Sequence, residues 1–248
     1  MRHLRPLRLA SFLLSALLVF GQSSGRDLNA ERLQTGSFRY RTTMAGKDAG
    51  ESLIQIRQPA ESGNYVYSNR VEGAFSQSWE AIATRVFAPV SAKLVYGQGD
   101  SARTSFELTY RDGRVKGFAY SGRDQLPSSR RVVDEAVAAD TVDQRIDWAA
   151  VMALPEYVTG GLYNFHVYDP GTGNSRITVE VRGFETIQVP AGSFSTARIA
   201  YRIEKNRGTE AYEVWVKSQS PRFLVKELFP NGAVTDLLQI QHLPPALP

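Results

Sequence analysis

Carboxylates are the first residues of this chain that could carry out chemistry. A pair of them can hydrolyse a glycoside or a peptide, one as the acid and the other as the base or nucleophile. The candidates are Glu180, Glu185, Glu204 and Glu213. Polar and apolar residues alternate around Glu180, so it shares a face with Arg182 and faces strands that carry Arg198 and Arg202. This pattern favours cross-strand charge pairs on a solvated sheet face over a catalytic pair.

Cysteine and histidine are too scarce for the common hydrolytic and metal centres. The absence of cysteine excludes disulfides, thiolate metal sites, a cysteine nucleophile and a lipid-attachment cysteine. His3 lies at the start of the chain, and neither His166 nor His242 has a second ligand at a spacing that would share its face. His166 alternates with apolar neighbours, which indicates a surface histidine. We therefore predict no enzymatic activity, no catalytic residues, no metal and no cofactor.

Three further patterns resemble functional motifs but lack the context that each motif needs. Residues 21–25 spell G-x-S-x-G, yet they do not lie between a strand and a helix. Residues 97–102 resemble a dinucleotide fingerprint, yet a strand pattern follows where a helix should begin. The basic cluster of Arg123, Arg130 and Arg131 is small. A nearly neutral protein attracts polyanions weakly, so we expect no nucleic-acid partner.

Residues 1–21 have the pattern of a signal peptide. Arg2, Arg5 and Arg8 accompany an apolar run at 9–20, which is shorter than the ~20 residues of a membrane span. Small residues place the cleavage between 21 and 25. Removal of the leader leaves 26 basic and 25 acidic residues, so the net charge falls from +4 to near +1. We predict a periplasmic or secreted protein with no transmembrane segment after removal of the signal peptide.

The rest of the chain has the alternation of half-buried antiparallel strands. Phe38 and Tyr40 share one face while the neighbouring arginines share the other, and the stretch at 106–111 repeats this period of two. Turn residues separate such segments at Asp112-Gly113, at 206–208 and at Asn231-Gly232. The sequence thus predicts one set of strands at about 35–120 and a meander of six or seven strands at 163–240.

The segment between these two sets departs from the strand pattern. Val142, Ile146, Ala149 and Ala153 have helical spacing, a capping box fits Thr141 with Gln144, and Pro155 follows, so a helix is expected over 141–154. Residues 122–139 are polar and indicate a loop that could include a short helical piece. Since each set of strands alone would bury only one face, we predict a single β-rich domain at 35–241, with a flexible Pro-rich tail at 242–248. Two subdomains are the alternative.

Several segments resemble a family of exported bacterial proteins, the domain of unknown function 3108. They are the opening hairpin at 40–51, the segment at 181–194 with its Pro190-Ala-Gly192-Ser-Phe194 signature, and the hairpin at 215–227. The resemblance spans about residues 36–241. It implies a mainly β fold, a strongly curved antiparallel sheet or half-open barrel similar to periplasmic lipoprotein carriers, with one short helix packed on or in it. It implies no activity.

Aromatic residues on the apolar faces could line the hollow of such a sheet, since tyrosine offers apolar area with one polar group. The predicted ligand-binding residues are Phe38, Tyr40, Tyr65, Tyr67, Phe106, Tyr110, Tyr201 and Tyr212. A solid core is the simpler interpretation. The first functional hypothesis is a non-enzymatic envelope protein that binds a lipid or other amphipathic molecule in the hollow. A structural or protein-interaction module of the envelope, which binds an envelope protein, is the alternative, and a carboxylate hydrolase ranks third.

Overall fold

The structure is a computed structural model that describes residues 23–24, 27–59, 62–72, 76–122, 125–206 and 208–241. The predicted leader at 1–21 and tail at 242–248 lie outside the described residues, as do Gly25, Arg123 and His242. Within the described part, no helix is long and apolar enough to cross a membrane.

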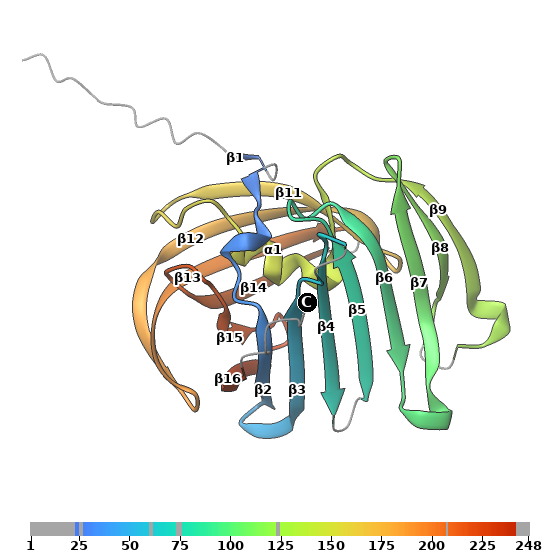
Figure 1. Cartoon of the computed structure of the whole chain (residues 1–248). Helices are drawn as coiled ribbons and strands as arrows, with labels where there is room; N and C mark the ends of the chain where they lie inside the picture. The colour runs from blue at the N-terminus through green and yellow to red at the C-terminus, as the bar shows by residue number, and fades with distance from the viewer. Residues whose placement is uncertain are drawn as a thin grey trace, which may run out of the picture.

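The first half of the chain is an antiparallel meander in which each strand pairs with the next (Figure 1). Its strands are β2 (Gly36–Met44), β3 (Lys47–Arg57), β4 (Tyr65–Glu72), β5 (Gln77–Ala83), β6 (Pro89–Tyr96), β7 (Arg103–Arg111), β8 (Arg114–Tyr120) and β9 (Arg130–Ala136). Short 3-10 turns precede or connect these strands: η2 (Ala30–Arg32), η3 (Gly99–Ser101) and η4 (Pro127–Ser129).

The second half is a second meander that continues the same sheet. It consists of β11 (Leu162–Asp169), β12 (Gly173–Val189), β13 (Gly192–Lys205), β14 (Gly208–Lys217), β15 (Leu224–Leu228) and β16 (Val234–Gln241). The last strand, β16, pairs antiparallel with β2, with Leu237 opposite Tyr40. The two halves therefore form one curved antiparallel sheet, and the predicted fold class is confirmed.

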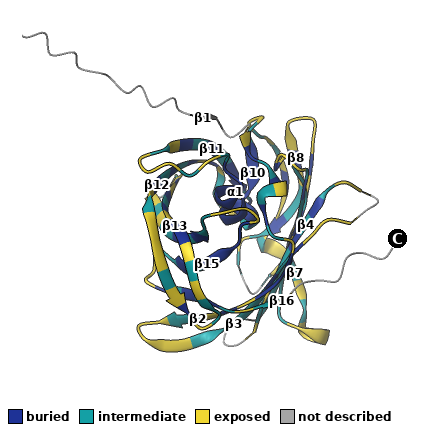
Figure 2. Ribbon diagram, turned by 60° about the vertical axis from the view of Figure 1, so that its left-hand side comes forward, coloured by how far each residue is buried: buried dark blue, intermediate teal, exposed yellow. Residues whose placement is uncertain are grey.

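The sheet curves around but does not close. One end is β9, and the other is β11, whose outer edge carries the short parallel strands β1 (Ser23–Ser24) and β10 (Thr141–Asp143). A side chain of β12, the neighbour of β11, contacts β9, because Asn174 Nδ2 donates to the carbonyl oxygen of Ala136 at 2.9 Å. The result is a half-open barrel (Figure 2).

The turns follow the predicted chemistry. Asp112 and Gly113 have φ values of 52° and 69° and connect β7 to β8, as a hairpin turn with positive φ requires. Asn231 and Gly232 lie between β15 and β16. Six strands occupy 163–240, in agreement with the predicted meander.

The predicted helix over 141–154 is wrong in extent. Thr141 and Val142 belong to β10, a 3-10 turn η5 (Gln144–Ile146) follows, and only α1 (Asp147–Met152) is α-helical. The N-cap of η5 is Asp143, whose carboxylate accepts from the backbone N–H of Arg145, so the predicted capping box does not form. Within 122–139, η4 matches the predicted short helical piece, but the prediction of a loop is wrong for β9.

The short helix α1 lies inside the curved sheet and closes part of its interior (Figures 1 and 2). All of its residues are buried. Arg222 stabilises its C-terminal end by donating from Nη1 to the carbonyl oxygens of Met152 and Leu154, at 3.0 and 2.5 Å. Arg32 donates to the carbonyl of Ala153 at 2.7 Å. Cations suit these carbonyls because the C-terminal end of a helix carries the negative end of the helix dipole.

Candidate functional site

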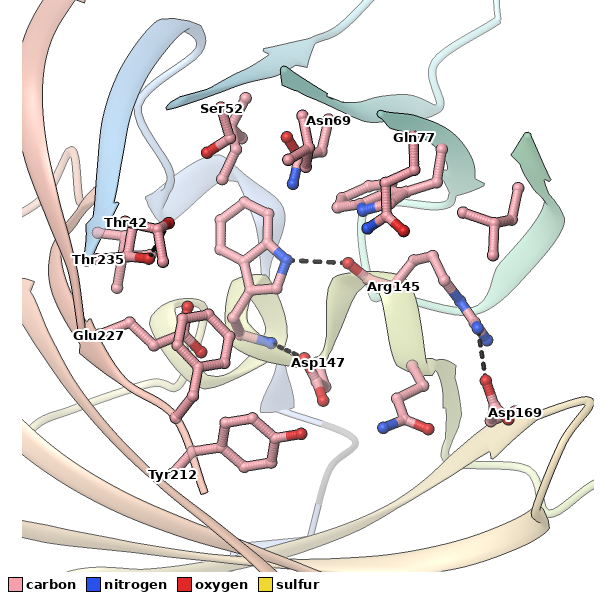
Figure 3. A pocket seen from close by; sticks show the side chains of 18 of the residues that line it. Thr42, Ser52, Asn69, Gln77, Arg145, Asp147, Asp169, Tyr212, Glu227 and Thr235 are labelled. Carbon is pink, nitrogen blue, oxygen red and sulfur yellow. Dashed lines mark hydrogen bonds and ion pairs between the residues drawn. The ribbon is translucent and has the colours of Figure 1, made fainter. Parts of the chain in front are cut away.

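A cavity of about 370 Å³ lies inside the sheet beside the first turn of α1 (Figure 3). Its walls come from both meanders and from the η5–α1 segment. The apolar wall includes Ile54, Val71, Trp79, Leu94, Leu224 and Phe229. Uncharged polar side chains from β2 to β5, from η5 and from β16 also face it: Thr42, Ser52, Asn69, Gln77, Gln144 and Thr235. A cavity of this size and mixed character is within the range of small-molecule sites.

Two buried carboxyl groups line this cavity from different elements. Asp147 begins α1 and is 6% exposed, while Glu227 lies on β15 and is 7% exposed. The Oδ1 atom of Asp147 accepts from the backbone N–H of Trp148 at 2.6 Å. The hydroxyl of Tyr201 donates to Glu227 Oε1 over a long 3.4 Å. Neither carboxylate has an ion-pair partner within the described part of the chain.

Burial strongly favours the protonated form of both groups. Desolvation raises the pKa of Asp147 to about 7, although the backbone N–H of Trp148 and the charge of Arg145 lower it. Desolvation, together with the negative charge of Asp147, raises the pKa of Glu227 to about 8. Near neutral pH the cavity thus disfavours the ionised form of both acids.

Arg145 also lines the cavity, but its donors are already engaged. It pairs with Asp143 and Asp169 at 2.6 Å each, and Nη2 donates to the carbonyl of Tyr168 at 3.2 Å. Burial opposes ionisation of Asp169, but the charge and hydrogen bond of Arg145, with the backbone N–H of Gly171 and the charge of Lys205, together lower the pKa of that carboxyl. The arginine therefore fixes η5 against β11 and forms no ion pair with Asp147 or Glu227.

Aromatic rings form another part of the wall. Tyr201 and Tyr212 stack with their ring centroids 4.8 Å apart and their planes at 5°. The Tyr212 hydroxyl donates to Glu210 at 2.8 Å, and Glu210 pairs with Lys205 at 2.7 Å. Trp148 is 8% exposed and its indole N–H donates to the carbonyl of Arg145 at 2.9 Å. The arrangement can hold a guest by apolar contact and hydrogen bonds.

A family profile matches residues 39–238, which is most of the chain. It describes proteins of unknown function, DUF3108. The chain belongs to this family. The resemblance inferred from the sequence is thereby confirmed. No curated protein matches the chain.

Solved structures resemble this DUF3108 protein in fold. One is a β-barrel-like protein of the domain of unknown function DUF1849 from Brucella abortus. It is 10% identical with a TM-score of 0.55, and the alignment covers 86% of this chain and 99% of that one. A protein described as exported, with a YmcC-like fold, from Bacteroides fragilis is 13% identical over the same shares, with a TM-score of 0.39. The first likeness supports the β-barrel-like fold, and the second is too low to add to it.

The eight aromatic residues predicted to bind a ligand lie in different surroundings. Tyr201 and Tyr212 line the cavity. The other six are packed in the core, at most 8% exposed, and do not line it: Phe38, Tyr40, Tyr65, Tyr67, Phe106 and Tyr110. Two of them have their hydroxyls engaged, since Tyr40 donates to the carbonyl of Leu224 at 2.9 Å and Tyr110 to Asp143 at 2.6 Å. Ligand binding by these residues stays a prediction.

The carboxylates singled out from the sequence lie away from this cavity. Glu180 pairs with Arg182 at 2.9 Å and Glu213 with Arg198 at 2.7 Å, as the alternation predicted. Glu185 accepts from the indole of Trp215 at 2.7 Å. Glu204 is exposed and lies opposite Arg176 in the β12–β13 pairing. These groups belong to the outer surface of the sheet.

His166 is half-exposed, and its Nδ1 lies 2.7 Å from Asp140 Oδ1. This partner lies far from His166 in sequence, so local spacing could not reveal it. Among the described residues, no group of three or more histidine, cysteine, aspartate or glutamate side chains could hold a metal ion.

Sequence reasoning missed Asp147 and Glu227, although each leaves a signal. Asp147 is the one acid in the apolar run Ile146–Leu154. Glu227 lies two residues before Phe229, in phase with a side chain that faces the cavity. An acid in phase with apolar neighbours is a better guide to a buried site than a pair of acids on a polar face.

Proposed function

We propose that this DUF3108 protein is a non-enzymatic, exported envelope protein that binds one lipid or other small amphipathic molecule in the cavity beside α1. The observation that carries the proposal is the cavity itself, where an apolar and aromatic wall meets a few inward-facing polar groups. Such a combination orients an amphipathic guest while it removes the apolar part from water. The signal-peptide pattern at 1–21 supports the envelope location.

Native mass spectrometry of the mature protein, purified from its own envelope under mild conditions, tests this proposal. We expect one added small-molecule mass per chain that is lost on unfolding, and organic extraction should recover the molecule. An apo mass under these conditions, with no molecule recovered, would argue against stable ligand binding. A co-purifying protein in place of a small molecule would favour the interaction module.

A matched pair of variants locates the ligand. Ser52 on β3 faces the cavity, whereas Ser68 on β4 lines a depression on the opposite face of the sheet. Ser52→Phe should fill the cavity and abolish the added mass. Ser68→Phe makes the same change outside and should keep it. Retention of the ligand by a folded Ser52→Phe variant would place the binding site elsewhere.

A hydrolase is the second candidate, favoured by the buried carboxyls Asp147 and Glu227 in one cavity. Strongly shifted pKa values are frequent in active sites. However, hydrolysis by two carboxyls needs one of them ionised. Burial raises the pKa of both groups, and neither has an ion-pair partner within the described part of the chain. The same extraction distinguishes the two functions. Cleaved product in the wild type and intact molecule in Glu227→Gln would establish hydrolysis.

The interaction module is supported by the outer edge of β9, which pairs with no strand other than β8 among the described residues. Val132 on this strand is 74% exposed, and an unpaired edge can accept a strand from another protein. Arg130 and Arg131 on the same strand oppose such pairing, because charged side chains protect sheet edges. We therefore rank this function below ligand binding.

A further inference from the structure

The acidic groups of the cavity are not matched by cations. Asp147 and Glu227 are both more than nine-tenths buried and line the cavity from different elements, α1 and β15. Asp147 Oδ1 accepts one backbone N–H, and Glu227 Oε1 accepts one long hydrogen bond from Tyr201. No hydrogen bond within the described residues engages their second carboxyl oxygens. Two acceptor oxygens therefore remain available to a guest.

The cations near these carboxyls are already paired with other acids. Arg145 is held between Asp143 and Asp169, and Lys205 is held by Glu210 at 2.7 Å. The negative charge of Asp143 also acts on Asp147 and raises its pKa. The other titratable groups that interact with Asp147 and Glu227 are the phenols of Tyr40, Tyr201 and Tyr212. Burial raises the pKa of each phenol, so these groups stay neutral.

A polar amide and several aromatic rings complete the surroundings. Asn69 lines the cavity, and its amide oxygen is buried without a hydrogen-bond partner. Figure 3 shows Asn69 and Glu227 on different sides of the cavity, with Asp147 at its base. Trp79, Trp148 and the stacked Tyr201–Tyr212 pair add π faces. Buried acceptors beside aromatic faces are the combination that recognises organic cations.

We propose that the ligand carries a primary ammonium group, which the carboxylates of Asp147 and Glu227 accept inside the cavity. Its apolar part then lies against Trp79 and Leu94 on the cavity wall. This inference rests on the proposed ligand-binding function and specifies the chemical class of the ligand.

In the empty cavity, protons take the place of the ammonium group. The raised pKa values of Asp147, about 7, and Glu227, about 8, show how strongly the site favours neutralisation. A bound cation stabilises the ionised carboxylates, so binding releases protons and tightens as the pH rises from 6 to 9. A neutral guest that accepts hydrogen bonds from the protonated acids would show the opposite dependence.

Calorimetric titration with three probes of similar size and different charge tests the proposal. The probes are phenethylammonium, 2-phenylethanol and phenylacetate. We expect phenethylammonium to bind about tenfold or more tightly than the alcohol at pH 8, and phenylacetate not to bind. Titration in two buffers with different heats of ionisation should show proton release upon binding of the amine.

Two isosteric variants and one surface control test whether Asp147 and Glu227 cause the preference for the amine. Glu227→Gln and Asp147→Asn should each reduce the preference for amine over alcohol by about tenfold and diminish proton release. Glu80→Gln on β5 is the matched control, because Glu80 lies on the outer face and pairs with Arg57 at 3.7 Å. It should leave all three affinities unchanged.

Three outcomes overturn the inference: equal or tighter binding of the alcohol, weaker amine binding at higher pH, or an unchanged preference in both isosteric variants. Failure of the inference is distinguishable from failure of the proposed function. A neutral or anionic molecule recovered from the native protein, and lost in Ser52→Phe, would reject the ammonium ligand while it supports ligand binding.

Discussion

At the scale of single residues, the main feature is that two acids occupy positions where apolar side chains would stabilise the fold. Glu227 faces the interior between Val225 and Phe229 and lies opposite Val214 in the β14–β15 pairing. A carboxyl in such a place is tolerated as the neutral acid and becomes costly once ionised. The stability of the protein should therefore depend on pH in a direction opposite to that of a salt-bridged carboxylate.

Glu227→Gln tests this dependence. The unfolded chain releases the Glu227 proton near pH 4.3, whereas the folded protein keeps it up to about pH 8. Between these values the folded state binds the extra proton, so the contribution of this group to stability falls as the pH rises and is fully lost above pH 8. The glutamine variant lacks this loss and should be more stable than the wild type by roughly 2–4 kcal/mol at pH 9.

Urea denaturation at pH 5 and pH 9 measures the free energy of unfolding of the wild type and of the Glu227→Gln variant. The measurement at pH 5 is the control for that at pH 9. At pH 5 the wild-type side chain is neutral in the folded state, so the gain of the variant over the wild type should be smaller than at pH 9. An equal difference at the two pH values would show that Glu227 is not protonated in the folded protein.

At the scale of elements, the tight approach of β8 to β7 depends on one glycine. Gly117 has a φ of 150° and lies opposite Leu108. A Cβ atom here would lie 1.9 Å from the carbonyl oxygen of Glu107, which is part of the backbone and cannot move aside cheaply. Gly117→Ala should destabilise the protein by about 2–4 kcal/mol, measured by urea denaturation.

Gly113→Ala in the adjoining turn separates the cost of the clash with a Cβ atom from the cost of a positive φ. Gly113 has a φ of 69°, and a Cβ there would contact nothing within 4 Å. This variant carries only the backbone cost of a left-handed alanine, about 1–2 kcal/mol. Equal losses in the two variants would mean that the β7–β8 contact is looser than described.

The elements also show which parts of the fold a sequence can predict. The hairpins at Asp112-Gly113 and Asn231-Gly232 were predictable because residues with positive φ mark them locally. The strand β9 was missed because it is an edge strand with a single buried residue, Val133. The prediction of a helix over 141–154 was wrong at β10 because all three residues of this strand are buried. A strand that is buried on both faces lacks the alternation of polar and apolar residues that distinguishes a strand from a helix.

The cavity was beyond sequence reasoning for a different reason. Its lining comes from residues as far apart as Thr42 and Thr235, whose hydroxyls lie 2.7 Å apart across β2 and β16. That neighbourhood exists only because β16 pairs with β2 and joins the ends of the chain. The family resemblance in the sequence predicted the curved sheet. Which acids face its interior depends on the strand register, which long-range pairing sets.

At the scale of the whole molecule, α1 connects the two meanders. Arg32, from before β2, and Arg222, from before β15, both donate to carbonyls near its C-terminal end. Its first turn lines a cavity with walls from both halves, and the buried apolar residues form one continuous cluster. Neither half can keep its inner face buried if the other unfolds, which argues for a single folding unit.

The three tryptophans make this prediction measurable, since Trp79 lies on β5, Trp148 on α1 and Trp215 on β14. Variants that retain one tryptophan, with the other two changed to phenylalanine, report on the first meander, the helix and the second meander. We expect each variant to show the same urea midpoint by fluorescence as by far-UV circular dichroism, because a single unit unfolds in one cooperative transition. A lower urea midpoint in the variant that retains Trp79 than in the variant that retains Trp215 would mean that the first meander unfolds on its own. The cavity would then open by separation of two subdomains. A ligand would stabilise the first meander most strongly, because Trp79 and the β3–β5 wall would contact the bound molecule.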